Sequence, residues 1–256
     1  MDPRLLEFKH RLGDVRRSLW PRYKEVRLHR LGSQDAWWLE REYEVYRKYG
    51  RRYADIIAEG APSGMRRPSD RVWVLWLQGM DNAPELVRAC HNSLLEYLPD
   101  KQVTVLSEKT LDDFVDLPGY IRDKHKAGKI PMAQYSDLIR ANLLVNHGGA
   151  WVDSTVLLTG GELPCYTMEL PLFCFKQLNM SNKDVAPILS SSWYISGYTN
   201  SSILELTQSL LWEYWRTHDR LEQYFLFHIF FALACRRFPE EWGAVPMFNN
   251  ATPHEL

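Results

Sequence analysis

The sequence contains few cysteines and no long hydrophobic run. Four cysteines in 256 residues, with no CxxC pair among them, do not form a disulfide framework. We therefore expect reduced, mostly buried thiols, as in the cytosol. The most apolar run, YFLFHIFFALAC (residues 224–235), is 12 residues long and too short to span a bilayer. It predicts a buried helix in which His228 is a core histidine with satisfied hydrogen bonds.

The N-terminal segment also lacks a targeting signal, but it carries an excess of positive charge. MDPRLLEFKHRLGDVRR has no apolar segment of the kind found in signal peptides, so we expect a cytoplasmic protein. The net charge is −1, which divides into +6 for residues 1–71 and −7 for residues 72–256. No nucleic-acid-binding motif accompanies the basic residues, so nucleic acid is not an expected partner. They indicate a solvated helical face, or a peripheral contact with the inner face of a membrane or with a protein. The closely spaced basic residues are Arg16, Arg17, Arg22, Lys24, Arg27 and Arg30.

The hydrophobic pattern changes at about residue 70. Residues 3–59 have apolar side chains three and four positions apart, which is typical of helices. Residues 59–70 (EGAPSGMRRPSD) are rich in Gly, Pro and Ser and predict a linker. We therefore expect a helical N-terminal extension, residues 1–70, and a second domain, residues 71–256.

The second domain begins with alternating strand and helix patterns. The apolar run from Val72 to Leu77 predicts a central strand, residues 82–99 an amphipathic helix, and residues 102–107 a second strand. This order is a βαβ unit, and it predicts an α/β fold with a mostly parallel sheet flanked by helices. Later segments extend the pattern, with helices expected at 112–129, 134–147, 201–217 and 221–236, and strands at 150–158, 170–176 and 192–197.

Polar residues gather in one window around residues 134–155. Asp137 and Arg140 are three residues apart and share one face of the expected helix, which Gly148 and Gly149 terminate. Asp153 follows at the carboxyl end of the next strand, the edge at which open α/β sheets bind ligands. Mg²⁺ or Mn²⁺ typically uses one or two protein carboxylates together with substrate phosphate oxygens. Asp153 and the hydroxyl of Thr155 therefore predict a partial metal site that a bound diphosphate completes.

Two segments resemble a known family. IPMAQYSDLIRANLLVNHGGAWVDSTV and VWVLWLQGMDNAPELV are similar to the core of the capsular polysaccharide synthesis and glycosyltransferase family 32 sugar transferases, which have the GT-A fold. The resemblance implies that Asp137 and Arg140 hold the ribose and order the donor site, and that Asp153 is the first Asp of an Asp-x-Asp metal motif. The second position of that motif is Thr155, not Asp, which leaves the mode of metal binding open.

The resemblance implies further contacts with the two substrates. Trp76 matches an aromatic residue that packs against the nucleotide base, and Gln78, Gln134 and Ser154 are expected beside the donor. Trp193 is a candidate for stacking on the acceptor sugar. Asn250 and His254 are candidates for a late metal or phosphate ligand.

The function implied is transfer of a hexose from a nucleotide sugar, uridine-linked, to a carbohydrate acceptor in surface polysaccharide synthesis. The catalytic residues expected are Asp153 and Arg140, the cofactor is Mn²⁺ or Mg²⁺, and the stereochemistry is retention. Two alternatives stay open. One is a GT-A scaffold that binds glycan or nucleotide sugar without turnover, because of Thr155. The other is a haloacid-dehalogenase-type phosphotransferase with Asp153 as nucleophile, although Val156 stands where that family has glycine.

Overall fold

The computed structural model describes residues 34–62, 64–160, 164–177 and 187–254. The chain divides into two compact units, Met1–Val45 and Tyr46–Leu256. In the first unit the described part is the start of helix α2 (Gln34–Arg52). The basic cluster and the helices expected before residue 34 lie outside the described residues. Residues 46–70 are part of the second unit, and the division expected at residue 70 stays a prediction.

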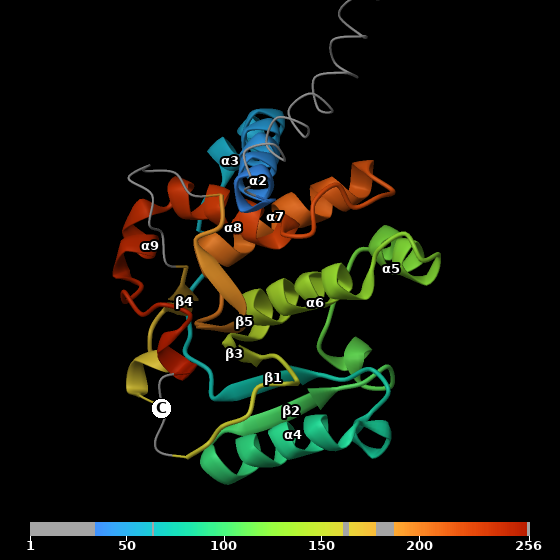
Figure 1. Cartoon of the computed structure of the whole chain (residues 1–256), viewed down its shortest axis with the longest axis vertical. Helices are drawn as coiled ribbons and strands as arrows, with labels where there is room; N and C mark the ends of the chain where they lie inside the picture. The colour runs from blue at the N-terminus through green and yellow to red at the C-terminus, as the bar shows by residue number, and fades with distance from the viewer. Residues whose placement is uncertain (1–33, 63, 161–163, 178–186, 255–256) are drawn as a thin grey trace, which may run out of the picture. The chain divides into compact units, whose positions relative to one another are not determined.

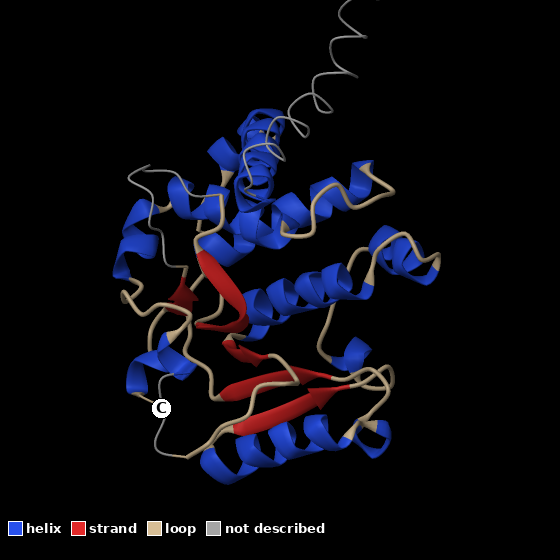
Figure 2. Cartoon of the chain, in the orientation of Figure 1, coloured by secondary structure: helices blue, strands red, loops and turns tan. Residues whose placement is uncertain are grey.

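The second unit contains the remaining helices and all the described strands (Figure 1; Figure 2). The helices after α2 are α3 (Ala54–Glu59), α4 (Glu85–Tyr97), α5 (Gly119–Lys126), α6 (Met132–His147), α7 (Ser202–Thr217), α8 (Leu226–Arg237) and α9 (Pro239–Ala244). The strands are β1 (Arg71–Leu75), β2 (Gln102–Leu106), β3 (Gly149–Val152), β4 (Leu172–Lys176) and β5 (Ser190–Gly197).

The five strands form one sheet in the order β2-β1-β3-β5-β4. β1 is parallel to both β2 and β3, whereas β5 is antiparallel to β3 and β4. Only β5 therefore runs against the direction of the other described strands. The predicted α/β fold, with a mostly parallel sheet flanked by helices, is confirmed.

The side chains of β1 alternate between two helical layers. Val72 and Val74 pack in one cluster with Leu94 of α4. Trp73 points to the other face, where its indole Nε1 donates to the carbonyl oxygen of Gly148, 2.8 Å away, at the end of α6. Figure 1 shows α4 and α6 on opposite sides of β1 and β2. A strand covered on both faces needs apolar residues throughout, which explains the uninterrupted run.

Three expected elements are shorter than their patterns. The helix expected at 112–129 is reduced to α5, because Pro118 cannot donate a helical hydrogen bond. The helix expected from residue 221 begins at Leu226. The strand expected at 150–158 ends at Val152, since the amide of Val156 donates to the carbonyl oxygen of Asp153 and closes a turn. Asp153 is thus the first residue after β3.

The cysteines and the apolar helices can be compared with what the composition predicted. Cys90, Cys174 and Cys235 are buried, as expected, and Cys165 is exposed. Within the described residues, no helix has both the length and the apolar composition that crossing a bilayer demands.

The Gly148–Gly149 pair lets β3 approach β1 closely. Both residues have positive φ, 61° and 89°, a region that side-chain-bearing residues rarely adopt. A Cβ on Gly149 would lie 2.2 Å from the backbone oxygen of Arg71. Only glycine therefore fits at the start of β3.

Replacing Gly149 tests this close approach. We expect Gly149→Ala to lower the free energy of unfolding by more than about 3 kcal/mol, because backbone strain and a clash with main chain act together. Gly119→Ala is the matched control, since its Cβ meets nothing within 4 Å. Urea unfolding compares the two variants with the wild type, and equal midpoints for both would contradict the explanation.

Candidate functional site

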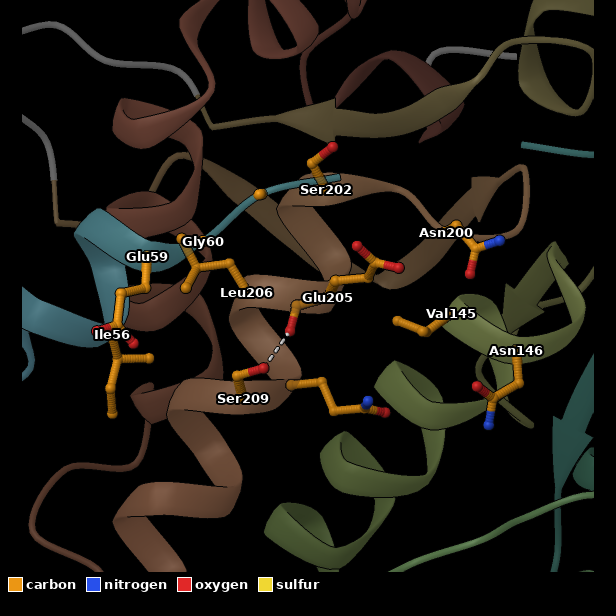
Figure 3. Close-up of a pocket in the computed structure, with 12 residues that line it drawn as sticks. Ile56, Glu59, Gly60, Val145, Asn146, Asn200, Ser202, Glu205, Leu206 and Ser209 are labelled. Atoms are coloured by element: carbon orange, nitrogen blue, oxygen red, sulfur yellow. Dashed lines mark hydrogen bonds between the residues drawn. The ribbon is translucent and has the colours of Figure 1, made fainter. Parts of the chain in front are cut away.

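A pocket of about 260 Å³ lies where the carboxyl ends of β1 and β3 meet the first half of α6. It contains six of the residues that the sequence predicted for the site, and it is lined by Leu75, Ala133, Gln134, Ser136, Asp137, Arg140, Trp151, Asp153, Ser154, Thr155, Ser192, Tyr224 and His228. The larger pocket in Figure 3, about 460 Å³, lies at the other end of α6 beside Val145 and Asn146. None of the predicted site residues lines it. We therefore take the smaller pocket as the candidate site.

Helix α6 contributes four polar residues to the lining of this pocket, Gln134, Ser136, Asp137 and Arg140. Gln134, Asp137 and Arg140 are spaced three residues apart and so share one face of the helix. All three are buried. The helix begins after Pro131 and ends at Gly148, whose φ of 61° is positive, so the glycine pair stops the helix as the sequence predicted.

Arg140 joins two carboxylates from different elements. Its Nη1 donates to Oδ1 of Asp137 at 2.6 Å, and its Nη2 donates to Oδ1 of Asp153 at 3.0 Å. Only 5% of the Arg140 side chain is exposed. The guanidinium also lies 4.8 Å from the centre of the Trp151 ring and 5.6 Å from that of Phe227. Removing one partner of such a buried ion pair typically lowers the free energy of unfolding by about 3–5 kcal/mol, because the other charge is left buried without a partner. The ion pairs therefore hold Asp137, Arg140 and Asp153 in this arrangement.

Asp137 is held away from water. Burial raises its pKa to about 6, and the nearby Asp153 carboxylate acts in the same direction, whereas the ion pair with Arg140 acts against both. Gln134 Nε2 donates to the other carboxylate oxygen, Oδ2, at 3.2 Å. The side chain of Asp137 is therefore fixed by both of its oxygens.

Asp153 faces the pocket and is partly open to it. Its Oδ1 accepts hydrogen bonds from Arg140 and from the indole of Trp151, at 3.0 and 2.7 Å. Its backbone amide donates to the carbonyl oxygen of Trp193 on β5, which fixes the main chain. Its side chain is 38% exposed, and among the described residues no donor reaches Oδ2. One carboxylate oxygen is thus held internally, and the other is available to a ligand.

The remaining predicted residues lie outside the pocket lining. Trp76 directly follows β1, and its Nε1 is buried without a partner among the described residues. Gln78 is exposed in the next turn. Trp193 stacks on Phe175 at 5.0 Å between ring centres. Asn250 donates through its side chain to Gln177 at 3.3 Å, and the side chain of His254 lies outside the described part of the chain.

Several lining residues were not predicted from the sequence. Trp151 is two residues before Asp153. Because residues two apart in a strand lie on the same face, Trp151 could have been predicted from the position of Asp153. Ser192 follows from the antiparallel pairing of β5 with β3, which no local pattern reveals. Tyr224 lies just before α8, and His228 lies in its first turn. The expectation that His228 has its hydrogen bonds satisfied is wrong, because its Nδ1 is buried without a partner among the described residues.

The match to a family model agrees with the family resemblance. Residues 28–256 match the family model described as "Capsular polysaccharide synthesis protein". No curated protein matches the chain. A solved structure named "PaToxG Glycosyltransferase" is similar, with a TM-score of 0.46 and 13% sequence identity over 80% of this chain and 83% of that one.

The raised pKa of Asp137 predicts a pH dependence of stability. Because the folded-state pKa, about 6, is above the unfolded value, about 3.8, the stabilising contribution of the protonated form is complete below pH 4 and is lost as the pH rises through 6. Between pH 4 and 7 we expect the wild type to lose about 3 kcal/mol relative to Asp137→Asn.

Urea unfolding of both proteins across this range measures the difference. Asp219→Asn serves as a control of opposite sign, since Lys129 and Lys124 lower the pKa of that exposed carboxyl. Parallel pH profiles for the wild type and Asp137→Asn would show that Asp137 titrates normally.

Proposed function

Because the chain belongs to the capsular polysaccharide synthesis protein family, we propose that it is a glycosyltransferase that moves a hexose from a nucleotide sugar, uridine-linked, to a carbohydrate acceptor. The observation that carries this proposal is the meeting of Asp137, Arg140 and Asp153 in one pocket at the carboxyl edge of the sheet. That edge is where open α/β sheets bind nucleotides. A surface ion pair or a turn-forming Asp would not require such an arrangement.

The charge of this cluster favours a bound cation. One guanidinium and two carboxylates sum to −1 when all are ionised, and an anionic diphosphate is repelled by a negative pocket. The described residues contain no group of three His, Cys, Asp or Glu that could hold a metal without substrate. Asp153 and the Thr155 hydroxyl nevertheless provide hard oxygen ligands, and Mg²⁺ or Mn²⁺ commonly combines one carboxylate with substrate phosphates. The donor set therefore fits a metal that binds together with the donor.

Each group in the pocket then has a distinct task. Asp153 and Thr155 would hold the metal, which when bound acts as a Lewis acid that stabilises the charge developing on the leaving diphosphate. Arg140 keeps Asp153 in place, and Asp137 and Gln134 keep Arg140 in place. The hydroxyls of Ser154 and Ser192 line the pocket and can bind phosphate or sugar oxygens.

The pocket offers no obvious enzymatic nucleophile. Asp137 and Asp153 are the only carboxylates among its lining residues, and Arg140 engages both. Both oxygens of Asp137 accept internal hydrogen bonds, and the free Oδ2 of Asp153 is the oxygen that we assign to the metal, so neither carboxylate is left to act as a nucleophile. We therefore favour a same-face substitution through an ion-pair-like transition state, with retention of the anomeric configuration. The phosphotransferase alternative is disfavoured by Val156, which stands where that family has glycine.

Binding and turnover test the proposal directly. We expect UDP-sugars with Mn²⁺ to raise the thermal unfolding midpoint, because a ligand at 100 times its Kd stabilises the folded state by about 2.7 kcal/mol. Incubation with a saccharide acceptor should release UDP, and NMR of the product should show retention. Binding without turnover would support the scaffold alternative, and inversion would overturn the same-face mechanism.

A conservative substitution separates the proposed catalytic role of Asp153 from its contribution to stability. Asp153→Asn keeps the shape of the side chain but removes its charge, and we expect transfer to fall by about 10²–10³-fold, as when one preorganised stabilising group is lost. Asp112→Asn is the control, because that carboxylate pairs with Arg122 on the surface. Similar rates for both variants at saturating Mn²⁺ would exclude Asp153 from the metal site.

A further inference from the structure

His228 is a pocket residue whose ring has no internal hydrogen-bond partner within the described part of the chain. It lies on α8, lines the pocket, and makes no hydrogen bond to any described residue. Its Nδ1 is buried, so Nε2 is the ring nitrogen left open to the pocket. The rings of Phe225 and Phe227 make T-shaped contacts with the imidazole, with ring centres 5.4 and 5.6 Å away, and so restrict its orientation. Buried or partly buried polar groups are nearly always hydrogen-bonded, so a partner from outside the chain is expected.

The same wall has two further incomplete hydrogen-bonding groups. Gln134 Nε2 donates to Asp137 and to the carbonyl oxygen of Tyr224, which fixes the amide and leaves Oε1 without a partner. Arg140 uses Nη1 and Nη2 for its two carboxylates, and its Nε is buried without a partner. Both side chains are at least nine-tenths buried. The unsatisfied atoms are therefore concentrated in the wall next to His228.

The chemistry of the wall selects among ligand groups. Burial and the Arg140 guanidinium lower the pKa of His228 to about 3, so the imidazole is neutral and has one donor and one acceptor nitrogen. A neutral ring offers a phosphate no charge, whereas a hydroxyl can donate or accept and so suits either tautomer. Tyr224, four residues earlier, is 63% exposed and lines the same pocket. A flat ring beside a neutral hydrogen-bonding group is typical of surfaces that bind sugars.

We propose that His228 and Tyr224 form a sugar-recognition subsite in which His228 Nε2 hydrogen-bonds to a ring hydroxyl of the donor. This inference rests on the proposed function and adds a substrate contact to it. The hydroxyl belongs either to the ribose of the nucleotide or to the hexose that is transferred. In both cases His228 contacts the substrate directly and discriminates between ligands by their hydroxyl groups.

The test compares binding of three probes by calorimetry with Mn²⁺: UDP, 2′,3′-dideoxy-UDP and UDP-glucose. His228→Phe keeps an aromatic ring but removes both nitrogens, whereas His228→Asn keeps a hydrogen-bonding group. If the subsite binds ribose, we expect His228→Phe to bind UDP about tenfold more weakly and dideoxy-UDP with unchanged affinity. If it binds the hexose, only UDP-glucose should weaken. His228→Asn should recover most of the lost affinity.

Controls separate this subsite from a structural role. His91→Asn changes a partly buried histidine on α4 that does not line the pocket, and it should bind all three probes like the wild type. Equal losses of affinity for all probes in His228→Phe, or no loss for any, would overturn the subsite while leaving the transferase proposal intact. Failure of the wild type to bind any probe would remove the proposed function, and the subsite with it.

Discussion

The buried guanidinium of Arg140 is the interaction on which the candidate site depends. It connects Asp137, one turn earlier on α6, to Asp153, which follows β3, and so ties a helix to the end of a strand. Without it the buried Asp137 carboxylate and the partly exposed Asp153 carboxylate would lie close together with no cation between them, and like charges repel strongly where water is excluded. The aromatic faces of Trp151 and Phe227 provide a weakly hydrated surface that suits a guanidinium better than an ammonium.

The turn between α6 and β3 makes that interaction geometrically accessible. Gly148 and Gly149 take up conformations that other residues avoid, and the chain passes within contact of Arg71 as it enters the sheet. The indole of Trp73 donates to Gly148 and fixes the end of the helix against β1. The parallel register of Trp73 with Trp151 then places Asp153 beside the end of β1. The position of the carboxylate is thus a consequence of how the helix stops.

Local patterns predicted the elements and the centre of the site, because both depend on short-range physics. The three-residue spacing of Asp137 and Arg140 and the glycine stop act within one helix and one turn. Residues that reach the pocket through long-range pairing were not predictable in the same way. Ser192 arrives on a strand that runs against its neighbours, and His228 arrives on a helix whose apolar sequence looks like pure core. Asn250 hydrogen-bonds to Lys176 and Gln177 at the end of β4, and its role as a metal ligand stays a prediction.

The net charge of the pocket matters for both the metal and the diphosphate. A fully neutralised ion-pair cluster would give a diphosphate nothing to bind, and a strongly negative one would hold a metal permanently. Here Asp153 uses one oxygen for Arg140 and Trp151 and leaves the second available. In the proposed function, one such ligand and a hydroxyl would hold a cation weakly until phosphate oxygens complete the shell, so that metal and donor would favour each other's binding. A neutral His228 leaves this balance unchanged, because it adds hydrogen bonding without adding charge.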